Sequence, residues 1–196
     1  MARGSLSCAG AGFPHAIREK AYHLVAEQFH IRSAIYPGAG RDIIPSLSIP
    51  SVVYLEESPL YADFYQNTEQ ILNWLGQRKK YGKPCSFTHY AVDYRHAPAL
   101  GQFDLLLSQY AGDVSQCMKA YLKSGGILLA AEGPEDVRLA MNDPDYELIG
   151  TINFEDGKAE LHPGLLPASY FEMVPENGAE PVRIPVERQF CFRKRT

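Results

Sequence analysis

The sequence lacks several patterns that would assign it at once to a well-defined class of protein. Its four cysteines form no CxxC pair, so neither a zinc knuckle nor a disulfide framework is predicted. No apolar run approaches the roughly 18 residues that a membrane span requires. The opening stretch MARGSLSCAGAG has no apolar core, unlike a secretory leader. We therefore expect a cytoplasmic protein with reduced thiols and no membrane partner.

Positive charge is also in short supply. Lysine and arginine number 19 against 23 aspartates and glutamates, which gives a formal net charge of −4. A chain with this balance lacks the broad electrostatic attraction that holds proteins to nucleic acid. The short basic clusters at 78–80 and 193–195 are typical of solvated ends of helices and strands. We expect a small-molecule substrate, no nucleic-acid partner, and a homo-oligomer as an open alternative to a monomer.

The length of 196 residues and the 45% hydrophobic content fit one domain with a single substantial core. We expect a flexible tail over residues 1–13 and one domain over 14–196. A stretch rich in proline, at about 162–185, interrupts that domain as an irregular excursion. We expect this excursion to cover the site or to mediate self-association.

Runs of strand and helix character alternate along the chain. Strands are expected at 33–36, 52–55, 85–92, 103–108, 127–131, 146–154, 158–161 and 188–194. Helices are expected at 14–30, at 58–80, from about 114 to a stop at Gly125–Gly126, and at 135–141, with one or two turns at 43–47. Alternation of this kind predicts a mainly parallel sheet with helices on both faces.

A glycine turn follows the first expected strand, in the stretch IYPGAGRDIIP. A Walker loop needs a lysine and a hydroxyl residue after its second glycine, but Gly40 is followed by Arg41 and Asp42. The dinucleotide fingerprint needs a third glycine where Ile43 stands, which weakens a nicotinamide-binding interpretation without excluding it. A helix starting near Arg41 would carry Asp42 in its first turn, where this carboxylate would compete with a pyrophosphate. The turn favours a cofactor with an adenosine but no phosphates.

Two carboxylates are expected at the same sheet edge as the glycine turn. Glu56 closes the second strand and follows Gly38 by 18 residues, close to the roughly 20 that place an acidic residue beside a ribose. Asp93 ends the third strand. The carboxyl ends of parallel strands share one edge of the sheet, so both side chains would line one crevice with the turn.

The ordered set of segments resembles the class I S-adenosylmethionine-dependent methyltransferases, a Rossmann-like family. The segments are YPGAG after the first strand, VVYLEES closing the second, AVDYR closing the third, FDLLLSQYAG as the fourth and YLKSGGILLA leading into the fifth. The resemblance covers about residues 31–131, with weaker agreement at 146–152 and 190–193. It implies an α/β fold, doubly wound, with a mainly parallel seven-stranded sheet, one antiparallel strand and helices on both faces. Its cofactor lies across the carboxyl ends of the strands.

Positions carried over from that family give the expected site. Glu56 would accept the ribose hydroxyls, Asp93 would accept the adenine amino group, and the turn would let the backbone approach the cofactor. The cofactor-binding set is Tyr36, Gly38, Ala39, Gly40, Glu56, Asp93, Tyr94 and Ser108. Ser108, Gln109 and Tyr110 would flank the methyl group and its acceptor, and the catalytic candidates are Ser108, Tyr110 and Asp113. The reaction implied is methyl transfer from S-adenosylmethionine to an unidentified small molecule.

Alternatives from other classes stay open at this point. The family usually carries an acidic residue two places before the first glycine, where this sequence has Tyr36 followed by Pro37. That difference motivates a non-catalytic, methyltransferase-like module for partner binding. A nicotinamide-dependent oxidoreductase is a second alternative. His89, Asp93 and His96 are residue types that bind metals, but alternation along a strand does not bring all three to one face, and no metal site is expected.

Overall fold

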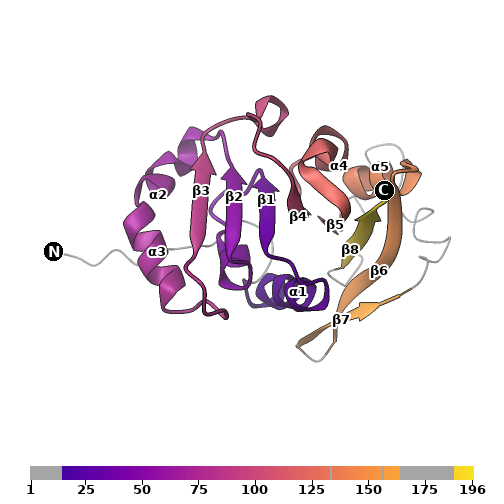
Figure 1. Ribbon diagram of the computed structural model, residues 1–196, viewed down its shortest axis with the longest axis horizontal. Helices are drawn as coiled ribbons and strands as arrows, with labels where there is room; N and C mark the ends of the chain where they lie inside the picture. The colour runs from indigo at the N-terminus through magenta and orange to yellow at the C-terminus, as the bar shows by residue number, and fades with distance from the viewer. Residues whose placement is uncertain (1–14, 133, 156, 164–187) are drawn as a thin grey trace, which may run out of the picture.

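The computed structural model describes residues 15–132, 134–155, 157–163 and 188–196. Its centre is an eight-stranded sheet in the order β3-β2-β1-β4-β5-β8-β6-β7 (Figure 1). The strands are β1 Ser33–Pro37, β2 Ser51–Leu55, β3 Ser86–Tyr90, β4 Phe103–Ser108, β5 Leu122–Ala131, β6 Tyr146–Glu155, β7 Lys158–His162 and β8 Gln189–Lys194. The first five run parallel, β8 is antiparallel to both β5 and β6, and β7 is antiparallel to β6.

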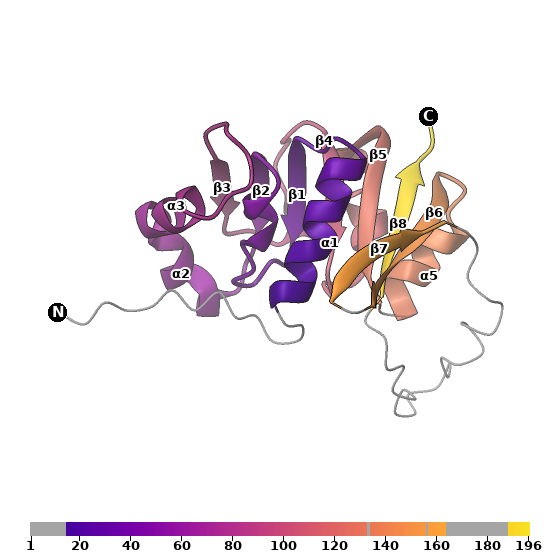
Figure 2. The same cartoon turned by 90° about the horizontal axis from the view of Figure 1, so that it is seen from below.

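Helices cover both faces of this sheet (Figure 2). They are α1 His15–Gln28, α2 Ala62–Gln66, α3 Thr68–Gly76, α4 Val114–Cys117 and α5 Pro134–Asn142, with short 3-10 helices η1 Ile44–Leu47, η2 Pro59–Tyr61, η3 Tyr94–His96 and η4 Lys119–Tyr121. Leu105 and Leu107 pack in one core cluster with α1 and α3, whereas Leu106 packs in the other with α4 and α5. Successive residues of β4 are therefore buried on opposite faces, as a central parallel strand requires. The predicted doubly wound α/β fold is confirmed.

The sheet has one strand more than the expected seven. The hairpin at Gly157, which has a φ of +72°, brings β7 alongside β6 in antiparallel register. The strand β7 also lies beside α1 (Figure 2), where Lys20 donates a hydrogen bond to the carbonyl of Gly157. Packing against this helix gives the additional edge strand a partner beyond its hairpin.

The expected helix over 58–80 is broken into η2, α2 and α3. Its start is as predicted, because the Ser58 hydroxyl accepts a hydrogen bond from the Leu60 amide ahead of Pro59. The break falls at Asn67, whose side-chain amide donates to the carbonyl of Asp63 at 2.6 Å, while the Thr68 hydroxyl donates to the carbonyl of Tyr65 at 2.9 Å. These side chains occupy carbonyls that a continuous helix would use.

Two further boundaries differ from the sequence expectation. The helix from 114 is short, and β5 already begins at Leu122 and passes through Gly125–Gly126 rather than starting after them. Leu122 pairs with Phe103 in the β4 ladder. Pairing with β4 therefore makes this segment a strand, although its apolar spacing predicted a helix. The connection from β1 to β2 contains only the four-residue η1, with Pro45 inside it. The tail at 1–13 and most of the excursion at 162–185 lie outside the described residues.

Candidate functional site at the carboxyl edge of the sheet

The glycine turn leaves β1 in a conformation that favours glycine. Gly38 and Gly40 have φ values of +61° and +58°, in the left-handed region that costs other L-residues roughly 1–2 kcal/mol. The Gly38 amide donates to the carbonyl of Leu55 at 2.8 Å, which ties the turn to the end of β2. Ala39, between the two glycines, is buried. The backbone of the turn is thus fixed against the neighbouring strand.

Glu56 holds the same turn from the other side. Its carboxylate accepts a hydrogen bond from the Gly40 amide at 2.7 Å and a second from the Ser58 amide at 2.8 Å. The side chain is buried apart from 8% of its surface. A carboxylate offers about four acceptor positions, and these two hydrogen bonds occupy two of them. The expected meeting of the glycine turn and the β2 carboxylate is found.

The sequence suggested that Asp42 would lie in the first turn of an α-helix. In the structure it does not. It precedes η1 and accepts the Ile44 amide at 3.1 Å through one oxygen. The other oxygen accepts from Arg18 at 2.7 Å and from the hydroxyls of Tyr22 and Tyr36, each at 3.2 Å. With no helix of useful length after the turn, the dipole that favours a pyrophosphate is missing. This geometry counts against a nicotinamide dinucleotide.

The Asp42 network also decides what Tyr36 can do. Tyr36 is buried to 2% exposure, and its hydroxyl is used by Asp42. Burial together with the neighbouring charge of Asp42 raises the pKa of this phenol, as it does for Tyr22. Burial alone would lower the pKa of Arg18, but Asp42 raises it above its ordinary value. Tyr36 therefore contributes a neutral ring and no charge to the turn.

The loop after β4 approaches the turn closely. A Cβ atom placed on Gly38 would lie 2.6 Å from the Cβ of Ala111, whereas one on Gly40 would lie 3.7 Å from the ring of Tyr61. The absence of a side chain at Gly38 therefore permits the close approach of Ala111, whereas Gly40 has more space beside it. The guanidinium of Arg41 lies over the Tyr61 ring, 5.8 Å from its centroid.

The predicted residues after β3 and β4 do come together. The Tyr94 hydroxyl donates toward the Ala111 carbonyl at 2.7 Å and toward Asp113 at 3.0 Å. Arg95 and the Cys117 thiol also bind Asp113. Burial would raise the pKa of Asp113, but the hydrogen bonds from Cys117, Tyr94 and Arg95 lower it. This carboxylate stays ionised, so it is a weak general base near neutral pH.

Asp93 and Ser108 are already engaged within the chain. Asp93 accepts the Arg95 amide at 2.9 Å and caps η3, and its carboxylate is half-buried. The Ser108 hydroxyl donates to Asp136 on α5, which also accepts the Ser115 amide at 2.9 Å. These hydrogen bonds would lower the pKa of Asp136, but burial outweighs them and raises it. Ser108 thus joins the end of β4 to α5.

Tyr110 is the most exposed of the predicted catalytic candidates. It is 57% exposed and has a φ of +69°, a left-handed conformation that is costly for an aromatic residue. Backbone strain of this kind is concentrated at functional sites. The structure therefore sets the Tyr110 ring at the surface of the carboxyl edge, in the loop that also carries Ala111 and Asp113.

Sequence reasoning missed Tyr65, which lies next to the expected adenosine-binding residues through its contact with His89. Its ring stacks on His89 with 3.7 Å between centroids and an interplanar angle of 4°. Its buried hydroxyl has no hydrogen-bond partner among the described residues, although such groups are normally paired. Burial and the charge of Glu56 raise its pKa. A buried donor left unpaired near Glu56 fits a ligand that brings acceptor oxygens.

His89 is held by the same part of the site. Its Nε2 lies 3.3 Å from the carbonyl of Glu56. Burial lowers its pKa, although Glu56 acts in the opposite direction, so the ring is neutral at pH 7. Across the described ranges, no group of three histidine, cysteine, aspartate or glutamate side chains is placed to hold a metal ion. The described helices also include none that is long and apolar enough to cross a bilayer.

Comparison with known proteins finds similarity in structure only. No family model and no curated protein sequence matches the chain. Residues 961–1257 of StiE, an O-methyltransferase region, superpose with a TM-score of 0.56 at 13% identity, covering 91% of this chain and 73% of that one. A proposed O-methyltransferase from Klebsiella pneumoniae gives 0.57 at 9% identity, covering 95% and 84%.

A third solved structure carries a ligand. The O-methyltransferase TomG from Streptomyces achromogenes, in complex with S-adenosylmethionine, gives a TM-score of 0.51 at 12% identity, covering 91% of this chain and 80% of that one. Within the seven neighbouring strands from β3 to β6, β8 is the antiparallel one, which agrees with the mainly parallel sheet with one antiparallel strand that the sequence resemblance implied. The chain therefore has the fold of the class I S-adenosylmethionine-dependent methyltransferases.

Proposed function

We propose that the chain binds S-adenosylmethionine at the carboxyl edge of its sheet and transfers the methyl group to a small-molecule acceptor. The observation that carries the proposal is the buried Glu56 carboxylate, which holds the Gly40 amide at 2.7 Å and, in addition to burial, raises the pKa of the unpaired Tyr65 hydroxyl through its charge. These groups offer acceptors and a donor to the hydroxyls of one ribose. Asp93, in the loop that follows the next strand outward, is then suited to the adenine amino group.

In this proposal, the residues of the β4–α4 loop act on the acceptor. Bound S-adenosylmethionine supplies an activated methyl group on a sulfonium sulfur. The chain has to align the acceptor and exclude water, which are the main contributions available to a reaction with this driving force. Tyr110 offers an exposed ring for such an acceptor. Asp113, ionised and fixed by Tyr94 and Arg95, orients the loop, and Ser108 contributes by holding Asp136.

Two observations support the non-catalytic alternative. Ala111 fills the space in front of Gly38, and the Tyr36 hydroxyl is directed to Asp42. No acidic side chain then replaces the one that the family usually carries ahead of the first glycine. A module of this kind would bind a partner without turning over the cofactor.

Calorimetry with S-adenosylhomocysteine tests the proposed cofactor. We expect saturable binding and no comparable signal with NADH. Binding of NADH with no response to S-adenosylhomocysteine would contradict the proposal. The acceptor class is tested with S-adenosylmethionine carrying a labelled methyl group, incubated with a protein-free, nucleic-acid-free metabolite extract. Label is expected in small molecules. Tight S-adenosylhomocysteine binding with no labelled product would instead support the non-catalytic module.

A further inference from the structure

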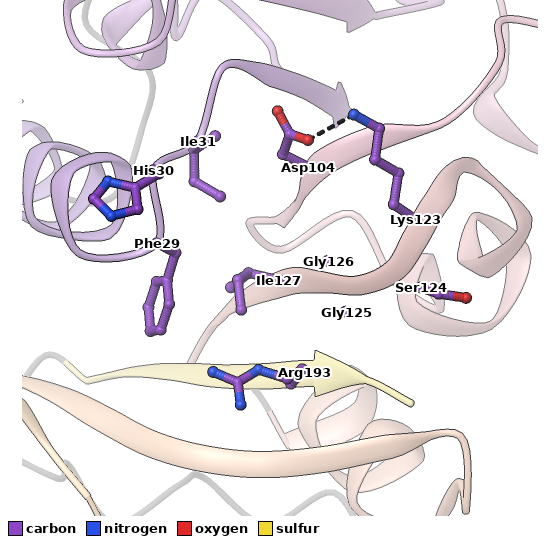
Figure 3. Close-up of a pocket in the computed structure, with 10 residues that line it drawn as sticks. All are labelled: Phe29, His30, Ile31, Asp104, Lys123, Ser124, Gly125, Gly126, Ile127 and Arg193. Atoms are coloured by element: carbon purple, nitrogen blue, oxygen red, sulfur yellow. Dashed lines mark hydrogen bonds and ion pairs between the residues drawn. The ribbon is translucent and has the colours of Figure 1, made fainter. Parts of the chain in front are cut away.

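A cavity of about 250 Å³ opens at the amino edge of the sheet, the edge opposite the glycine turn. It lies between the end of α1, the start of β4, the first half of β5 and the end of β8 (Figure 3). Phe29, Ile31 and Ile127 give it apolar walls, and Arg193 extends along β8 below Phe29 and Ile127. The cavity thus combines these apolar side chains with the polar side chains of His30, Asp104, Lys123, Ser124 and Arg193.

A bulge in β5 forms one wall of this cavity. Phe103 pairs with Leu122 and Leu105 pairs with Ile127, so the four residues 123–126 oppose a single residue of β4. The register with β8 begins only at Ile127. Within the described strands, the ladder positions therefore give the bulge no partner on either side. Gly125 is exposed and a Cβ placed on it would meet no atom within 4 Å, so a ligand can approach its amide group closely, whereas Gly126 is buried against Leu122.

His30, at the rim, has a backbone conformation that glycine would adopt at a lower conformational energy. It follows α1 with a φ of +53°, and the Ile31 amide bonds back to the Ala26 carbonyl at 3.0 Å. This is the helix C-terminal motif whose left-handed position is usually glycine. The protein keeps an imidazole there in spite of the backbone cost, and strained residues of this kind are found at ligand sites.

Two lysine or arginine side chains line the cavity, and among the described residues Lys123 forms an ion pair whereas Arg193 does not. Asp104 is paired with Lys123 at 2.7 Å, and its second oxygen accepts from the amides of Arg32 and Ser33 and from the Ser33 hydroxyl. Glu147 opposes Arg193 in the β6–β8 register. No ion pair or side-chain hydrogen bond recorded among the described residues involves Arg193. Its guanidinium remains available to an anion.

We propose that this cavity binds a small phosphate monoester with an apolar or aromatic body. Arg193 matches the phosphate with a forked pair of donors, the amides of the β5 bulge add neutral donors, and His30 lies at the entrance. Phe29, the most exposed of the three apolar side chains, packs against the body of the ligand. The site is separate from the proposed cofactor site, and it would let a phosphorylated metabolite act on the protein from the opposite edge of the sheet.

Phenyl phosphate is the probe, followed by amide chemical shifts of the full chain. We expect saturable shifts at Gly125, Gly126 and Arg193, with inorganic phosphate and benzoate each binding more weakly. Arg193→Gln should weaken phenyl phosphate roughly ten- to a hundredfold, the range for a charge-assisted pair. Arg195→Gln is the matched control, because Arg195 follows β8 and does not line the cavity. Its affinity should equal that of the wild type.

His30→Gly separates a ligand role from a structural one. Removing the side chain relieves the backbone, so the melting temperature should rise while phenyl phosphate binds severalfold more weakly. Equal affinity for wild type and Arg193→Gln would overturn the proposal, as would benzoate or inorganic phosphate binding as tightly as phenyl phosphate, or no saturable shift at millimolar concentration. Arg193→Gln should leave S-adenosylhomocysteine affinity unchanged, which keeps this test independent of the proposed cofactor site.

Discussion

Glu56 accepts a 2.7 Å hydrogen bond from the amide of Gly40. One carboxylate therefore links the end of β2 to the turn that follows β1. Its other oxygen holds the Ser58 amide at the start of the next helical segment. The residue proposed to bind a ribose is also a structural tie, so its removal has to be measured in the absence of ligand as well as in its presence.

Glu56→Ala should weaken S-adenosylhomocysteine binding and lower the melting temperature. It leaves two amides without acceptors, at a cost of about 1–3 kcal/mol for each one that stays buried. The ligand affinity of the molecules that remain folded should fall roughly tenfold or more. Glu56→Gln keeps one acceptor oxygen, so its ligand affinity and its melting temperature should fall less than those of Glu56→Ala. Calorimetry and thermal unfolding together measure the two effects.

The neighbouring carboxylate is the control for this experiment. Glu57 is exposed, and no hydrogen bond recorded among the described residues involves its side chain. Glu57→Ala should leave the S-adenosylhomocysteine affinity and the melting temperature near their wild-type values. A Glu56→Ala protein that is less stable but binds S-adenosylhomocysteine with unchanged affinity would show that Glu56 is a structural tie only.

Alanine at each of the two glycines should separate backbone strain from steric overlap. Gly40→Ala meets an unfavourable φ but has room, and should cost about 1–2 kcal/mol of unfolding free energy. Gly38→Ala meets the same φ and places its Cβ 2.6 Å from that of Ala111, so it should cost more. Urea denaturation measures both. The double variant Gly38→Ala/Ala111→Gly should recover part of the difference, and equal costs for the two single variants would rule out the close contact.

Asp42→Ala should be strongly destabilising. Arg18 and Asp42 form a 2.7 Å ion pair in which both side chains are less than a tenth exposed. Removing one member of a buried pair leaves the other charge uncompensated, which costs about 3–5 kcal/mol. Tyr22→Phe, which removes a single 3.2 Å hydrogen bond to the same carboxylate, should cost about 1 kcal/mol. A loss for Asp42→Ala no larger than that for Tyr22→Phe would contradict this interpretation.

Asp104 should make stability depend on pH in the acid range. Burial would raise its pKa, but hydrogen bonds from Lys123 and from the backbone amides of Arg32 and Ser33 lower it below the ordinary value of 3.8. A carboxylate with a lowered folded-state pKa stabilises the protein above its unfolded pKa and loses that contribution as the pH falls toward the folded value. Asp104→Asn should lower stability at neutral pH and flatten the decline below pH 3.8. Asp63→Asn, at an exposed position, should keep the wild-type profile in thermal unfolding.

The sequence predicts best where one local pattern decides the structure. The run FDLLLS forms β4 with the expected bounds, because a strand buried on both faces has to be apolar throughout. The proximity of Gly40 and Glu56 followed from their spacing around a parallel strand pair. The interruption of the 58–80 helix at Asn67 was not predicted, since it depends on which carbonyls the short polar side chains occupy.

Contacts between distant segments could not be predicted from local patterns. The partner of Asp42 is Arg18, 24 residues earlier, and the neighbour of Gly38 is Ala111, which a different loop supplies. Both depend on how α1 and the β4–α4 loop pack onto the sheet. Those contacts decide whether a polar side chain bonds within the core or faces a ligand in the crevice. The roles proposed for Tyr36, Asp93, Tyr94, Ser108, Tyr110 and Asp113 therefore stay predictions.

The position of β8 has a consequence for the order in which the chain folds. This strand is the last of the described strands in the chain, yet it lies between β5 and β6 in the sheet. During synthesis, β6 and β7 emerge before the strand that joins them to the parallel half. Until residues 189–194 arrive, β6 and β7 form a two-stranded hairpin that can pack against α1 but has no strand joining it to β5, and a hairpin of two strands is only marginally stable in water. Closure of the sheet is therefore a late, non-local step, of the kind that slows folding and leaves the edge of β5 exposed to association with other nascent chains.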